Sequence, residues 1–169
     1  HGCGYFQVTE KDGFRCSTAV GYLNPIKKRQ NLTIITDAHV KKINFENKTS
    51  KEVEYWQDNE LKKVQANKEI ILSSGAIGSP QILQVSGIGN PDKLKNLGIE
   101  VAQDLKGVGE NLQDHLMFRP IYKINNIKSL NKKVNSLFGK LMIGLEYVFN
   151  RSGPMTMGAS QLCMFAKSD

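Results

Sequence analysis

The chain has 169 residues, of which 40% are hydrophobic and 23% are charged. This apolar share is enough to bury a core, which excludes a disordered chain. The length fits one domain or parts of two, and no stretch reaches the ~18 uncharged apolar residues of a membrane span. The sequence opens at His1 without a signal-peptide pattern or a starting Met, so we expect an internal piece of a longer protein.

The charge is basic: 23 Lys and Arg stand against 16 Asp and Glu, a net charge of +7. The basic residues are mostly dispersed lysines, typical of a solvated surface, whereas a phosphate-binding surface gathers arginines. We therefore expect no nucleic-acid partner. The alternative, a basic module that binds nucleic acid or an acidic protein through the Lys-rich hairpin 43–66 without catalytic activity, stays open. Cys3, Cys16 and Cys163 are odd in number and far apart, which fits a reducing compartment, and we expect the cytoplasm.

The first half of the chain predicts strands. A short β-branched run covers 32–36, and alternating apolar and polar residues then predict a β-meander or hairpin with one solvated face, turning at 46–48 and 58–60. The run 69–73 is continuously apolar. Such a run predicts a strand covered on both faces, as in a parallel sheet.

Two helices are predicted next. A small-residue turn at 74–78 leads to a helix capped by Ser79, with proline in its first position and Gly87 past its end. The second helix runs from the N-cap Asn90 to Gly98 in the same way. A strand, a glycine turn and a helix together place backbone N–H groups where a phosphate or a flat-lying cofactor can bind.

The remainder is predicted as a strand at 99–101, a polar loop at 105–115, a strand at 116–126 and a helix at 134–149. The apolar residues of this helix share one broad face, expected to lie toward the core. An arginine, a glycine and a proline within 151–154 end it. The change of composition near residue 116 is the candidate domain boundary.

Short motifs predict no metal site. Three Gly-x-Gly stretches lack the third glycine of a dinucleotide fingerprint and are interpreted as turns. The histidines His1, His39 and His115 have no metal-ligand spacing, and no Gly-x-Ser-x-Gly elbow supplies a nucleophile. His115 follows Asp114, but adjacent residues of an extended chain point opposite ways, so a structural polar loop is favoured over a proton carrier.

Segment 75–89, GAIGSPQILQVSGIG, resembles the second signature of the glucose–methanol–choline (GMC) flavoprotein oxidoreductases. Three further stretches resemble segments of this family in the same order: RCSTAVGYL at 15–23, NLTIITDAHV at 31–40 and GVGENLQDH at 107–115. The resemblance is strong over about residues 13–120. Within the family, the choline-dehydrogenase-like alcohol dehydrogenases are most similar.

The resemblance implies an α/β fold: a partial Rossmann-like FAD-binding domain with a β-meander in 1–115, and the start of an α+β substrate-binding domain in 116–169. It implies a fragment of an FAD-dependent enzyme that oxidises a primary alcohol, choline being one candidate, to an aldehyde by hydride transfer to flavin N5. Two electron acceptors stay open, oxygen or a membrane quinone. The second would bring the full-length protein into peripheral association with a membrane.

Six residues match family positions that contact the cofactor. One has its backbone against the adenine ring, three form the turn near the ADP half of FAD, and two lie in the loop near the flavin: Val40; Ser74, Gly75 and Ala76; Asn111 and His115. The family's pyrophosphate-binding GxGxxG and its catalytic histidine match nothing in this sequence. The resemblance therefore implies no catalytic residue in this chain, and a piece that alone neither binds FAD tightly nor turns over.

Overall fold

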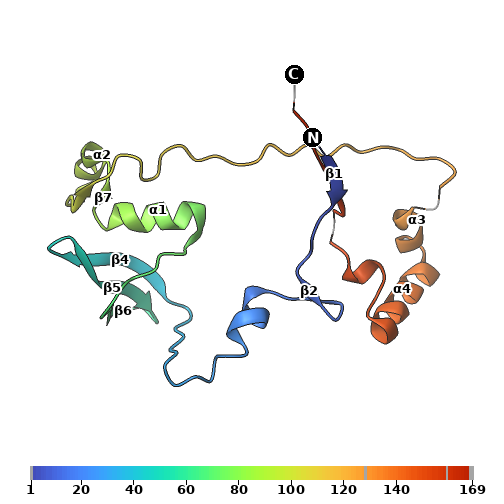
Figure 1. Cartoon of the computed structure of the whole chain (residues 1–169), viewed down its shortest axis with the longest axis horizontal. Helices are drawn as coiled ribbons and strands as arrows, with labels where there is room; N and C mark the ends of the chain where they lie inside the picture. The colour runs from blue at the N-terminus through green and yellow to red at the C-terminus, as the bar shows by residue number, and fades with distance from the viewer. Residues whose placement is uncertain (1, 128, 159, 168–169) are drawn as a thin grey trace. The chain divides into compact units, whose positions relative to one another are not determined.

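The computed structural model describes residues 2–127, 129–158 and 160–167. The chain divides into two compact units, one formed by Ile35–Arg119 and one by the parts up to Ile34 and from Pro120 onward (Figure 1). Within the described ranges, no helix combines the length and the apolar character needed to cross a membrane. A boundary between cofactor and substrate domains after residue 115 stays a prediction.

The unit Ile35–Arg119 contains the predicted meander. Strands β4 (His39–Glu46), β5 (Thr49–Gln57) and β6 (Glu60–Gln65) pair antiparallel in that order. Both connecting turns have two residues of positive φ, Asn47 and Lys48 in the first, Asp58 and Asn59 in the second. Positive φ at both central residues is what a tight type I′ hairpin turn requires, so these polar pairs fix the register of the sheet.

Helix α1 (Gly75–Val85) packs against β4, an edge strand of the meander, and lies beside it in Figure 1. Ile43 of β4 and Tyr55 of β5 are buried, and Leu94 of helix α2 (Pro91–Asn96) is only 2% exposed. These apolar side chains form the core of the unit. Burying apolar area is the main force that holds a helix on a sheet.

A small parallel element follows α1. Strand β7 (Ile88–Gly89) pairs with β8 (Gln103–Asp104), and α2 connects them. As predicted, Asn90 caps α2 by accepting the N–H groups of the residues two and three positions later, and Gly98 ends it with a φ of +69°. The strand predicted at 99–101 is wrong: pairing with β7 begins only at residue 103.

Helix α1 begins earlier than predicted. Of the residues expected to form a turn, 74–78, those from 75 onward are helical, and Pro80 lies inside the helix. Ser79 is not the N-cap; its Oγ instead reaches back and accepts the N–H of Ser74 at 3.0 Å. The serine–proline pair therefore lies within the first two turns of α1 and does not mark its start, and the serine hydroxyl accepts a backbone N–H five residues upstream.

Three predicted strands are absent from the described structure, at 32–36, 69–73 and 116–126. Ile71, expected to be covered on both faces, is 78% exposed. A strand forms only when a neighbouring strand accepts and donates its backbone hydrogen bonds, and the described residues provide no such neighbour for these segments. The three segments therefore have the residue patterns of strands but no backbone pairing with another strand.

The second unit holds two small antiparallel pairs. Strand β1 (Gly2–Tyr5) pairs with β9 (Leu162–Phe165), and β2 (Glu10–Lys11) pairs with β3 (Phe14–Arg15). A π-helical turn, η1 (Ala19–Leu23), follows β3. The two ends of this chain are thus joined by a β-ladder.

The helix predicted at 134–149 is two helices, α3 (Leu130–Val134) and α4 (Leu137–Asn150), followed by a 3₁₀ turn, η2 (Pro154–Thr156). The break arises at Ser136, whose Oγ accepts the N–H of Gly139 at 2.9 Å and so caps a new helix.

The apolar face of α4 is not core-facing as expected. Ile143 is buried, but Phe138 and Phe149 are 73% and 78% exposed. At the end of the helix, Arg151 adopts a left-handed φ of +50°, and its guanidinium lies 4.5 Å from the ring centre of Phe14. This cation–π contact joins α4 to the β2–β3 hairpin.

Candidate functional site

The six predicted cofactor residues lie on three segments of the unit Ile35–Arg119. Val40 is half-buried in β4. Ser74, Gly75 and Ala76 are exposed where α1 begins, and Asn111 and His115 are exposed in the loop that follows β8. The fold therefore presents these positions from a strand, a helix N-terminus and a loop of one unit.

Gly75 provides open space at the start of α1. Its φ is +83°, and a Cβ built on it would have no other atom within 4 Å. The backbone is thus free to be approached closely, which is what a flat cofactor needs. The N–H groups of the first helical turn also have no partner within the helix and favour negative charge. These residues fit the ADP half of FAD.

A groove of about 580 Å³ lies between α1 and the loop 107–112. Its walls are mainly apolar on both sides and include Ala76, Leu83 and Gln84 of α1 and Val108, Glu110 and Leu112 of the loop. Of the predicted cofactor residues, Ala76 is part of this lining. Ala76 is the residue next to Gly75, so the groove lies adjacent to the start of the helix.

Two side chains hold this loop. Gln84 of α1 donates from Nε2 to the carbonyl oxygen of Val108 at 3.1 Å, and Lys93 of α2 forms an ion pair with Glu110. The next residue, Asn111, has a left-handed φ of +55°. The loop is therefore anchored immediately before the predicted flavin contact.

His115 shows no arrangement for proton transfer. Its backbone N–H donates to Asp114 Oδ1 at 2.7 Å, so the carboxylate binds the main chain. The imidazole is exposed. This geometry agrees with the prediction of a structural polar loop at this position.

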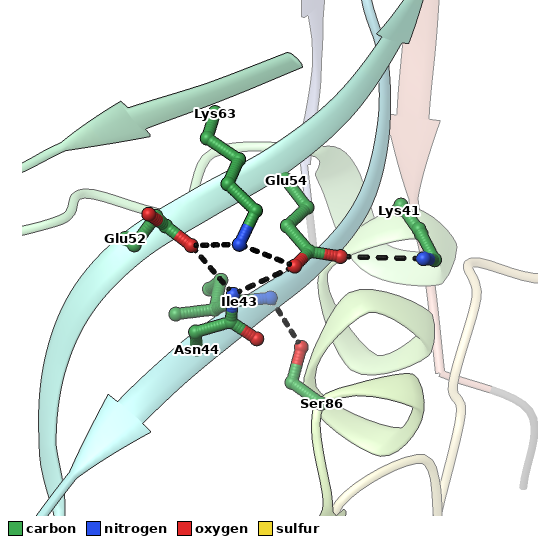
Figure 2. A network of polar contacts seen from close by, with 7 residues as sticks. All are labelled: Lys41, Ile43, Asn44, Glu52, Glu54, Lys63 and Ser86. Atoms are coloured by element: carbon green, nitrogen blue, oxygen red, sulfur yellow. Dashed lines mark hydrogen bonds and ion pairs between the residues drawn. The ribbon is translucent and has the colours of Figure 1, made fainter. Parts of the chain in front are cut away.

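A polar network covers the opposite face of the meander (Figure 2). Asn44 Nδ2 donates to Oε1 of Glu52 at 2.8 Å and of Glu54 at 3.0 Å. Lys63 Nζ lies 3.0 Å and 3.2 Å from the same two oxygens, and Lys41 Nζ lies 3.3 Å from Glu54 Oε2. Glu54 is only 6% exposed, and this pairing is what allows a charged group to be buried there.

The network shifts the ionisation of its members. The hydrogen bond from Asn44, and after it the contacts with Lys63 and Lys41, lower the pKa of Glu54 from 4.5 to about 2, although burial opposes the shift. Asn44 and Lys63 likewise lower the pKa of Glu52, and the two carboxylates raise the pKa of Lys63. The charged forms therefore stabilise the meander that carries Val40.

Asn44→Ala is expected to destabilise the protein in a pH-dependent way. A carboxylate whose pKa is lowered by folding contributes stability above its unfolded pKa, 4.5, and loses it as the pH falls toward the folded value, about 2. The difference in melting temperature between wild type and variant should thus be full at about pH 7 and shrink steadily from about pH 5 downward.

The control is Asn90→Ala, which removes the cap of α2 without touching a carboxylate. Its difference from wild type is expected to stay constant over the same range. If Asn44→Ala shows a difference as constant as the control, Asn44 does not set these pKa values.

The residues that connect the three segments are not evident from the sequence. Ser86, buried at the end of α1, accepts the N–H of Ile43 in β4 at 2.8 Å, and Gln84 binds the loop at Val108. In the sequence both residues belong only to a helix pattern, because no local pattern reveals hydrogen bonds across 43 and 24 residues.

Comparisons with known proteins give one family. The family model described as GMC oxidoreductase matches residues 1–117. An oxygen-dependent choline dehydrogenase of Pectobacterium carotovorum subsp. carotovorum is 47% identical over 153 residues, 90% of this chain and 26% of that protein. An alcohol dehydrogenase [acceptor] of Pseudomonas putida is 38% identical over 170 residues, 99% of this chain and 31% of that protein.

The structure is also similar to solved structures of flavin-dependent oxidoreductases. A solved FAD-dependent oxidoreductase from Chaetomium thermophilum matches with a TM-score of 0.78 and 29% identity, over 89% of this chain and 27% of that one. This confirms the expected α/β class with part of a Rossmann-like FAD-binding domain. The comparisons do not support the alternative of a basic binding module. The chain spans between about a quarter and a third of its relatives, and it belongs to the GMC oxidoreductase family.

Proposed function

We propose that this chain supplies part of the FAD site of a flavoenzyme that oxidises a primary alcohol to an aldehyde. The open backbone at Gly75, at the start of a helix and beside the groove, carries the proposal. Relatives called choline dehydrogenase and alcohol dehydrogenase, and a similar FAD-dependent oxidoreductase, support it.

The chain's own residues bind and orient the cofactor in this proposal. The backbone of Val40 would lie against the adenine, Ser74–Ala76 beside the ADP half, and the loop with Asn111 and His115 near the flavin. FAD, when bound, supplies the acceptor for a hydride from the carbinol carbon. A cofactor that lies along the groove would have apolar walls on it, which would reduce its contact with water.

Choline is the first substrate to test, because relatives that match 90% of this chain carry its name. An aromatic cage for a quaternary ammonium group is not evident in the sequence of residues 117–169, so simple aliphatic alcohols are tested beside it. Oxygen and a membrane quinone are both proposed as electron acceptors, and a cytoplasmic location stays a prediction.

The test is anaerobic mixing of the purified full-length protein with choline and with a series of primary alcohols. We expect bound FAD, and loss of its visible absorbance with at least one of these alcohols. Adding oxygen or a soluble quinone analogue to separate portions then shows which acceptor restores the absorbance. A protein without flavin, or a flavin that no primary alcohol reduces, contradicts the proposal.

Residues 1–169 produced alone serve as the control. We expect a colourless preparation without activity, because the sequence lacks the family's pyrophosphate-binding GxGxxG. A yellow preparation with one FAD per chain would show that these residues suffice for the cofactor.

A further inference from the structure

The last turn of α1 carries two side-chain hydrogen bonds to segments far away in the sequence. Ser86 binds β4, and Gln84 binds the loop 107–112. These two segments and the start of α1 hold five of the six predicted cofactor residues, and the sixth, His115, follows the loop three residues later. The turn is therefore the place where the parts of the site are joined.

Ser86 uses its hydroxyl in both directions. The oxygen accepts the N–H of Ile43 at 2.8 Å, and the O–H donates to the carbonyl oxygen of Ile82 one turn earlier in α1. Figure 2 shows the hydroxyl reaching from α1 to the strand. Ile43 and Ser86 are 6% and 9% exposed, so water cannot readily replace this bond. It fixes where α1 ends relative to β4, three residues from Val40.

Gln84 contacts the loop 107–112 closely at Val108 and Gly109. Its Nε2 donates to the carbonyl oxygen of Val108 at 3.1 Å, and a Cβ on Gly109 would lie only 2.5 Å from the same nitrogen. Gly109 has a φ of +78°, so the loop bends around the carboxamide at a position that favours glycine. Asn111 follows two residues later.

We infer that Ser86 and Gln84 are positioning residues of the cofactor site. Each acts through another segment: Ser86 sets β4, and Gln84 sets the loop, against the helix that begins at Gly75. An α-helix of this length is a rigid rod of about 16 Å, so a change at its last turn alters the spacing of contacts at its first. The inference rests on the proposed function, since it concerns the same FAD site.

The experiment compares FAD affinity with stability in the full-length protein. Ser86→Ala removes the bond to β4, and Gln84→Met removes the bond to the loop while keeping the length of the side chain. We expect the Kd for FAD, titrated into the apoprotein, to rise about tenfold in each variant. Ser86→Thr keeps a hydroxyl and should restore most of the affinity.

Ser136→Ala is the matched control. That serine also accepts a backbone N–H, from Gly139, and donates to a backbone carbonyl, of Lys133, but it lies in the other unit and far in sequence from the predicted cofactor residues. Ser136 is exposed, whereas Ser86 is buried, so the melting temperature of Ser136→Ala should fall less than that of Ser86→Ala, and its Kd for FAD should change by less than about twofold.

The outcomes separate the two hypotheses. If the wild-type protein binds FAD and both Ser86→Ala and Gln84→Met bind it as tightly, or lose no more affinity than Ser136→Ala, the positioning role is refuted while the proposed function stands. If the wild-type protein binds no FAD, the proposed function fails and the positioning role fails with it. If Ser86→Ala does not fold, the FAD affinities of Gln84→Met and Ser86→Thr still test the positioning role.

Discussion

Gly75→Val is expected to weaken FAD binding by at least about 100-fold. Gly75 has a φ of +83° and open space where a Cβ would be. Because a Cβ there would have no other segment of the chain within 4 Å, we expect the branched side chain of a valine to extend into the space proposed for the cofactor. The measurement is the Kd for FAD of the full-length apoprotein, followed by flavin fluorescence, beside the free energy of unfolding.

The matched control for this prediction is Gly98→Val. Gly98 also has a positive φ, +69°, and also has no atom within 4 Å of a built Cβ, but it lies past the end of α2. Both variants should lose about 1–2 kcal/mol of stability, since a side chain strains the left-handed conformation. Only Gly75→Val should lose affinity. Equal losses of affinity in both variants would mean that the effect comes from strain alone.

Gly87→Ala is expected to lower the free energy of unfolding by about 3 kcal/mol. Gly87 is buried between α1 and β7 with a φ of +88°, and a Cβ on it would lie 2.4 Å from the carbonyl oxygen of Glu100. Its own carbonyl oxygen accepts the N–H groups of Ala102 and Gln103. The methyl group would therefore push apart the two chain segments that lead into the parallel β7–β8 pair.

Urea unfolding of the full-length protein measures this loss. The control is Gly98→Ala, which has the strain of a positive φ without the contact and should cost about 1 kcal/mol. If Gly87→Ala costs no more than Gly98→Ala, the backbone of residues 100–102 does not lie as close to Gly87 as the structure has it.

The elements predicted correctly are those whose sequence signals are local. The meander follows from alternating side chains and from two polar pairs, Asn47-Lys48 and Asp58-Asn59, that accept positive φ. Helix α2 follows from an asparagine cap, a proline and Gly98. In each case the residues that fix the geometry are neighbours in the chain.

The elements predicted wrongly depend on distant partners. An apolar run such as 69–73 favours a strand that is covered on both faces. The run itself does not show whether a neighbouring strand is present to pair with it. Ile71 is exposed in this structure for that reason. The same holds for the exposed face of α4, where Phe138 and Phe149 have apolar side chains and little to pack against.

The site was predictable in part. The resemblance over 31–40, 75–89 and 107–115 led to the residues that could touch a cofactor, and Gly75 has the open backbone expected of a residue that a cofactor approaches closely. The side chains that join these segments could not be found in that way. Ser86 and Gln84 act through bonds to Ile43 and Val108 that only the folded chain brings within reach.

The hairpin turns of the meander also bear on the order of assembly during translation. Strands β4, β5 and β6 are consecutive and joined by tight turns, and pairings between near neighbours form fastest. These three strands can therefore pair soon after they leave the ribosome. The hydroxyl of Ser86 is synthesised 43 residues after the amide of Ile43 that it binds. Helix α1 therefore packs against a sheet that can already have formed.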